Sequence, residues 1–121
     1  MSFTTTAQSD PIAGKLTTVT TVAVVDGPPA EDENVTGASG IWYQVDIDNS
    51  SNSEATYVKL WNAASVTLGS TVPDWIFLVR AGTRRTFSNT SGGTFGAALS
   101  VCAVTEGGTT GTTSMAGDVV T

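Results

Sequence analysis

The chain has 121 residues and a mass of 12.4 kDa, the size of one compact domain, so a multi-domain organisation is excluded. Because 40 % of the residues are hydrophobic and only 13 % are charged, the composition also excludes a disordered chain. The net charge of −6 opposes nucleic-acid binding, since affinity for phosphate comes from Lys and Arg.

The N-terminal third is rich in Thr, and the chain as a whole contains 21 Thr and 12 Ser. Thr is β-branched and favours strands, and good helix formers cluster nowhere at a helical period, so we expect an all-β fold. Residues 1–13 are polar and are predicted to form an N-terminal arm. A long strand is expected from Gly14 to Val25, and residues 30–40 are expected to form an exposed acidic loop.

The central segment contains the clearest alternation of the sequence, from Ile41 to Asp48. Here Ile41, Tyr43, Val45 and Ile47 are predicted to face inward, and the residues between them outward. Residues 49–53 have turn chemistry, and a second strand is predicted from Ala55 to Trp61. We expect these two strands to be antiparallel neighbours.

In the C-terminal half, apolar runs alternate with Gly-rich segments that are typical of turns. We predict strands over residues 75–79, 84–87 and 94–105, a flexible connection over 88–93, and a short final strand over 119–121. Residues 106–121 are predicted to form a C-terminal arm or edge strand. Together these features predict a single domain over residues 1–121, an antiparallel β-sandwich or jelly roll with flexible terminal arms.

Histidine is absent, which removes the commonest general base, the usual metal ligand and every Ser-His or Cys-His nucleophile. We therefore expect a non-enzymatic protein with no catalytic residue and no cofactor. The single Cys102 lies in an apolar run and is predicted to be a small buried side chain.

Targeting signals are not evident in the sequence. No apolar run reaches the roughly 18 residues of a membrane span, and the N-terminus lacks the basic and apolar regions of a signal peptide. We expect cytoplasmic synthesis and no membrane partner.

Two acidic segments are candidates for cation binding. The segment Asp46 to Glu54 carries oxygen-bearing side chains at alternate positions, as a calcium loop does, but it lacks the glycine and the final acid of that loop. The triplet Glu31, Asp32 and Glu33 is a charge run. A polar turn and a solvated loop are the plainer interpretations.

Six side chains are candidates for contacts with a partner. Arg80, Arg84 and Arg85 are three of the five cations and flank one turn, where they form either a basic contact spot or a solvated hairpin end. Trp42 lies on the polar side of its strand, so it is either covered by a second layer or exposed at a contact surface. Trp61 and Trp75 are assigned to the core or to its rim.

The order of features from residue 40 to residue 121 resembles a group of small virion proteins of tailed phages. The matching features are Tyr57 to Trp61, the Gly69 and Pro73-Asp74 loop, the apolar strand ending before Ala81-Gly82, and the late apolar run that leads into a Gly/Thr-rich tail. Arg80 departs from the pattern, which has a proline there. No functional residue carries over from this group.

This resemblance implies a capsid decoration or cement protein on the outer surface of the virion. Its partner would be the major capsid protein, and it would act as a homo-oligomer, with a trimer favoured because it matches local three-fold positions. The alternative is a host-recognition module on a tail or head fibre, which would bind glycans through Trp42, Trp61 or Trp75.

Overall fold

The computed structural model describes residues 2–7, 18–23 and 33–113, and these residues contain strands and turns but no helix. The strands are β1 (Ser2–Ala7), β2 (Thr18–Ala23), β3 (Gly40–Asn49), β4 (Thr56–Asn62), β5 (Trp75–Val79), β6 (Thr83–Phe95) and β7 (Leu99–Val104). The pairings between these strands are antiparallel. The predicted all-β antiparallel fold is confirmed, and the sandwich or jelly-roll assignment stays a prediction.

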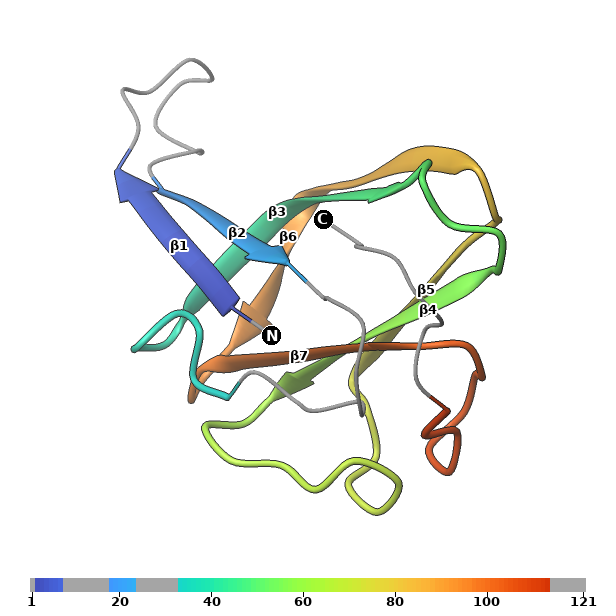
Figure 1. Ribbon diagram of the computed structural model, residues 1–121. Coiled ribbons are helices and arrows are strands. Elements are labelled where there is room, and N and C mark those ends of the chain that lie inside the picture. Colours follow the sequence, from blue (N-terminus) through green and yellow to red (C-terminus); the bar gives the residue numbers. More distant parts are fainter. Residues whose placement is uncertain (1, 8–17, 24–32, 114–121) are drawn as a thin grey trace.

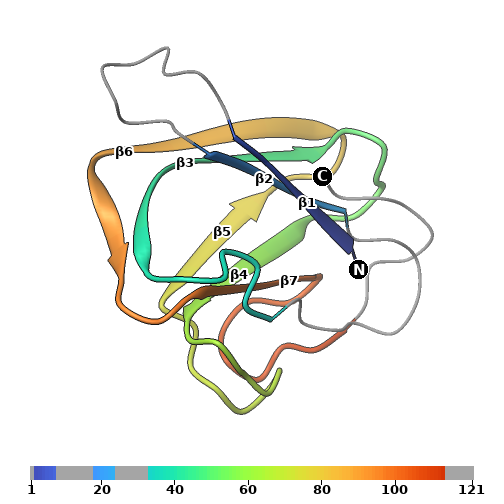
Figure 2. The same cartoon turned by 90° about the vertical axis from the view of Figure 1, so that its left-hand side faces the viewer.

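The described strands form three sheets: β1 with β2, β3 with β6, and a three-stranded sheet in the order β5-β4-β7. Figure 1 shows the β3–β6 ribbon next to the three-stranded sheet. In Figure 2 this ribbon bends, and both of its strands turn together. β3 and β4 therefore belong to different sheets, and the prediction that they are antiparallel neighbours is wrong.

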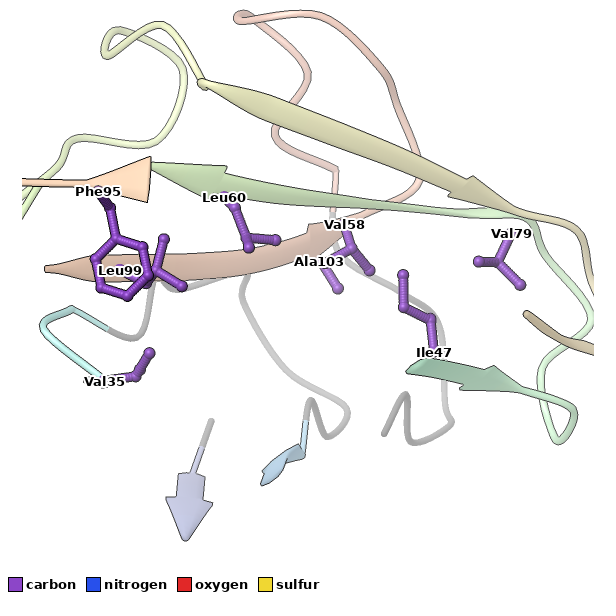
Figure 3. Packing of buried hydrophobic residues seen from close by; sticks show 8 residues of the cluster. All are labelled: Val35, Ile47, Val58, Leu60, Val79, Phe95, Leu99 and Ala103. Atoms are coloured by element: carbon purple, nitrogen blue, oxygen red, sulfur yellow. The ribbon is translucent and has the colours of Figure 1, made fainter. Parts of the chain in front are cut away.

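The main core lies between the β3–β6 ribbon and one face of the three-stranded sheet (Figure 3). Val58 and Leu60 of β4 belong to this core together with Ile47 of β3. A second, smaller core covers the opposite face of the sheet, where Trp61 and Cys102 are buried. The strands β4 and β7 are thus covered on both faces, and the predicted burial of Cys102 is confirmed.

A register shift in the ribbon changes which side chains of β3 face inward. Trp42 pairs with Gly93 but Gln44 pairs with Ser88, so β6 has extra residues opposite a single residue of β3. The alternation reverses there: Trp42 packs against the main core, whereas Ile41 is 48 % exposed. The inward prediction holds for Val45 and Ile47 and is wrong for Ile41.

Two predictions in the C-terminal half are wrong. Residues 88–93, predicted to be a flexible connection, are part of the long strand β6. Residues 94–105, predicted to be one strand, contain the end of β6, a break at residues 96–98, and β7. The turn chemistry of Gly92, which has a φ of 83°, serves a bulge within a strand rather than a loop.

The structure describes parts of the two predicted terminal arms, and their assignment as arms stays a prediction. Residues 2–7 are paired with 18–23 inside the chain, because two Thr-rich segments of high β-propensity complete each other's backbone ladder. Residues 106–113 fold back onto the second core, with the Thr105 amide donating to the Thr113 carbonyl at 3.0 Å. The rest of the predicted strand over 14–25, the rest of both arms and the final strand at 119–121 lie outside the described residues.

Candidate functional site

The turn that leaves β3 is a buried polar junction that the sequence pattern does not predict. The Asn49 side chain is fully buried, and its Nδ2 donates to the carbonyls of Glu54, Val79 and Arg80 at 2.9, 3.3 and 3.2 Å. Its Oδ1 accepts from Asn52. One amide therefore holds together the end of β3, the turn before β4 and the end of β5, so the junction is structural.

The carboxylates of the calcium-like segment do not converge. Asp46 forms an exposed ion pair with Arg84, whose hydrogen bond holds the pKa of this carboxyl below its ordinary value. Asp48 instead accepts from the Ser50 amide at 3.0 Å and from its hydroxyl, which lowers the pKa of Asp48. These are the contacts of a polar turn.

The acid triplet is described only at Glu33. Its Oε1 accepts hydrogen bonds from the Ser65 hydroxyl at 3.0 Å and from the Val66 amide at 2.7 Å. Glu33 therefore fastens the loop after β4 to the segment before β3. Among the described residues no group of three His, Cys, Asp or Glu side chains is placed to hold a metal ion.

The three candidate arginines have different contacts. Arg84 is engaged by Asp46, and this carboxylate raises the pKa of the guanidinium. Arg85, the next residue of the strand, lies over the Phe87 ring at 5.0 Å from its centroid. Arg80 is exposed in the turn between β5 and β6, where its backbone carbonyl takes part in the polar junction.

The three tryptophans separate into two environments. Trp61 is only 1 % exposed in the second core, and its Nε1 donates to the Thr71 carbonyl at 2.9 Å. Trp61 is therefore a core residue whose surface is not available to a partner. Trp42 and Trp75 are half-buried and meet edge to face, with ring centroids 5.7 Å apart.

Trp42 and Trp75 belong to an aromatic cluster that joins the ribbon to β5. Phe77 lies 5.8 Å from Trp42 and 4.8 Å from Phe87, measured between ring centroids. A Cβ added at Gly93 would lie 1.9 Å from Nε1 of Trp42, so this glycine lets the indole lie against the β6 backbone. These half-buried rings pack on one another and on the main core.

A buried lysine lies on the opposite face of β4. Lys59 is fully buried, and its Nζ donates to the Gly111 carbonyl at 2.7 Å. Burial lowers its pKa, an effect opposed by Cys102 and Glu106. Nothing in the local pattern signals this burial, since Lys is rarely fully buried. The hydrogen bond from Lys59 to the Gly111 carbonyl therefore attaches the 106–113 segment to β4.

The remaining feature is an apolar strand at a sheet edge. Among the described strands β5 pairs only with β4. Trp75, Phe77 and Val79 face inward, while Ile76 and Leu78 are 41 % and 42 % exposed on the outer face. Figure 2 shows β5 beneath the bent ribbon. We call Trp75–Val79 with its flanking Asp74 and Arg80 the β5 edge.

The β5 edge has the properties of a protein contact surface. An edge strand presents unpaired N–H and C=O groups that can pair with another chain, and natural edges are usually protected by Lys, Pro or a bulge. The five residues Trp75–Val79 contain none of these protections. Residue type alone selects Trp75 and Arg80 as candidates but not the exposed Ile76 and Leu78 between them.

No protein-family model, no curated protein and no solved structure matches this chain. In the described part of the chain there is also no helix of the length and hydrophobicity that crossing a bilayer requires.

Proposed function

We propose that this chain is a non-enzymatic structural protein of a tailed-phage particle, which decorates the capsid and stabilises it by bridging subunits of the major capsid protein as a homo-oligomer. The resemblance of residues 40–121 to small virion proteins motivates the kind of particle. The single observation in the structure that supports an assembly role is the β5 edge, where Ile76 and Leu78 are exposed on an open strand.

An exposed apolar strand edge is unfavourable unless something pairs with it. Apolar side chains left in water forgo about 25 cal/mol for each Å² that a partner would cover, and open edges promote unwanted association. Ile76 and Leu78 lie next to each other on one face, so a partner would cover both. This arrangement supports binding to protein rather than to a small molecule.

The body behind the β5 edge suits a mechanical role. β5 is fixed from three sides: by the ladder to β4, by the aromatic cluster on its inner face, and by the Asn49 amide at its end. A contact strand held in this way loses little conformational entropy on binding. Load applied at the edge would therefore pass into both cores.

The test is the composition of the particle. Virions should be purified and the abundance of this chain measured by quantitative mass spectrometry against the major capsid protein, with cryo-electron microscopy to locate it. We expect it on the head, in numbers comparable to those of the major capsid protein. A few copies confined to the tail or to fibres would overturn the proposal in favour of host recognition. Absence from virions would also overturn it.

A further inference from the structure

We propose that the β5 edge pairs with the β5 edge of a second copy of this chain, antiparallel and about a two-fold axis at Phe77. This inference rests on the proposed structural role, because it names the first contact that such a protein makes. It commits to one partner, a second identical chain, and to one register.

The backbone of β5 is open to such pairing. In an antiparallel sheet, alternate residues direct their N–H and C=O groups toward each neighbour, so about half of those groups on an edge strand point away from the sheet. Among the described strands β5 has β4 on one side and no strand on the other. A second β5 would therefore continue the sheet as β4-β5-β5-β4.

Side chains fit this register. With Phe77 opposite Phe77, Ile76 of one copy lies opposite Leu78 of the other. These residues share the outer face of β5, and both are exposed. Cross-strand neighbours lie about 4.5–5.5 Å apart between Cβ atoms, so the four side chains of the two copies would cover one another.

Charges at the two ends of β5 select the same register. Asp74 directly precedes the strand and Arg80 directly follows it, so the segment reads Asp, five apolar residues, Arg. When Phe77 lies opposite Phe77, Asp74 of each copy lies opposite Arg80 of the other, which makes two ion pairs. A slip of the register along the strand loses both pairs.

Asp74 and Arg80 can each form an ion pair with a second copy. Asp74 uses Oδ2 to accept from the Asn62 amide of β4 at 2.7 Å, so Oδ1 is the oxygen that would meet Arg80 of a second copy. The exposed Arg80 forms no ion pair within the part of the chain that the structure describes. The exposed Asp74 and Arg80 therefore flank β5 at its two ends.

This end-to-end symmetry points to a second copy rather than to an unrelated strand. A two-fold contact places the same surface on itself, so each end of the segment must complement the other. A strand of a different protein would need complementarity to the β5 edge but would impose no such symmetry on it. The trimer expected from the sequence would need two different patches in a ring and cannot be built from this contact alone.

A cross-linking experiment tests the register. The two purified variants Ile76→Cys and Leu78→Cys are mixed and oxidised, with Cys102 too buried to compete. A disulfide from position 76 to position 78 joins directly opposite residues, whereas 76–76 and 78–78 links join diagonal residues that lie farther apart. We expect the mixed dimer to form nearly all of the cross-linked product, whereas random pairing of an equal mixture would give only half. A statistical mixture, or no cross-link, would overturn the register.

Matched substitutions test the surface, using sedimentation velocity over a range of concentrations. Leu78→Lys should abolish the dimer, while Ile41→Lys, at an apolar residue with similar exposure on β3, should leave it intact. Arg80→Asp should weaken dimerisation about tenfold, because two ion pairs become two repulsive pairs, and Arg85→Asp should not. Melting temperatures show that each variant is folded.

The outcomes separate this inference from the proposed function. A wild-type chain that stays monomeric at its highest soluble concentration would overturn the β5 pairing. So would a trimer that Leu78→Lys does not disturb. Neither result would overturn the proposed capsid role, because a monomer or a trimer can still be abundant on the head. That role is tested separately, by the composition of the particle.

Discussion

The Asn49 side chain shows how one amide can hold two sheets in place. It is buried at the end of β3, and the two N–H groups of its Nδ2 are shared among three carbonyls, those of Glu54, Val79 and Arg80. A buried carbonyl that loses its donor keeps its desolvation cost. The junction therefore depends on the amide itself and not only on the space it fills.

Asn49→Ala should lower the free energy of unfolding by about 2–4 kcal/mol, since it removes a buried donor from the Val79 carbonyl and from the partly buried carbonyls of Glu54 and Arg80. Urea denaturation followed by tryptophan fluorescence measures this change. Ser50→Ala, at the neighbouring exposed residue, is the matched control and should cost less than about 1 kcal/mol. Equal losses for both variants would show that Asn49 is not the centre of the junction.

Lys59 should give the folded protein an unusual alkaline pH dependence. Its pKa is lowered by burial from the ordinary 10.5, so the unfolded chain binds more protons than the folded chain between the lowered pKa and 10.5. In that window the free energy of unfolding therefore increases as pH rises. Below the window, protonated Lys59 costs the folded state a constant amount.

The comparison that isolates this effect is wild type against Lys59→Met, which nearly keeps the volume and removes the charge. Urea denaturation from pH 7 to about pH 10.5 should show wild type gaining stability relative to the variant as pH rises toward the ordinary value for lysine. A difference that is flat with pH, or that falls, would mean that Lys59 is not held in a desolvated site.

Among the elements, β3 shows how a bulge decides which residues form the core. Alternation alone assigns Ile41 and Val45 to the same face. The shift between Trp42 and Gln44 leaves Val45 packed against the main core and turns Ile41 out to solvent. Identical substitutions at these two positions should therefore have different costs.

Val45→Asp should destabilise the fold by about 2–4 kcal/mol, because a carboxylate would replace an apolar side chain that packs on the core. Ile41→Asp should cost less than about 1 kcal/mol, because Ile41 is already half in water. Thermal and urea unfolding of the two variants provide the measurement. Similar melting temperatures would contradict the shifted register.

Local pattern explains which elements can be predicted. The strands β3, β4 and β5 follow from alternation or from a short apolar run between turn residues, and the predicted bounds agree closely with the observed ones. The glycines of β6 carry the same local signal in a bulge as in a loop, and only the pairing with β3 distinguishes them. This is why the sequence predicts a loop at residues 88–93.

Parts of the candidate site depend on contacts distant in sequence, which no local pattern contains. The burial of Lys59 requires Gly111, which lies 52 residues later. Trp75 and Arg80 are selected by residue type, but the exposure of Ile76 and Leu78 depends on β5 being an edge, which is a property of strand order. Composition and motifs predict strands, whereas long-range pairing decides which strand stays open.

As a whole, the described part of the protein is an all-β fold in which the edge strand β5 is apolar and open. Two cores cover the strands β4 and β7 on both faces, and the 106–113 segment closes the second core over Lys59. The β5 edge combines unpaired backbone groups with exposed apolar side chains. If the proposed function is correct, the β5 edge is the surface through which the protein would act in a phage head.

Rebinding to capsids that lack this chain tests that expectation. Wild type, Leu78→Lys and Ile41→Lys are added to such particles, and bound protein and the temperature of shell rupture are measured. We predict that wild type and Ile41→Lys bind and raise the rupture temperature, whereas Leu78→Lys binds weakly and gives little protection, because dimeric attachment is lost. Equal binding and protection by Leu78→Lys, or no binding by wild type, would contradict a role for the β5 edge in the phage head.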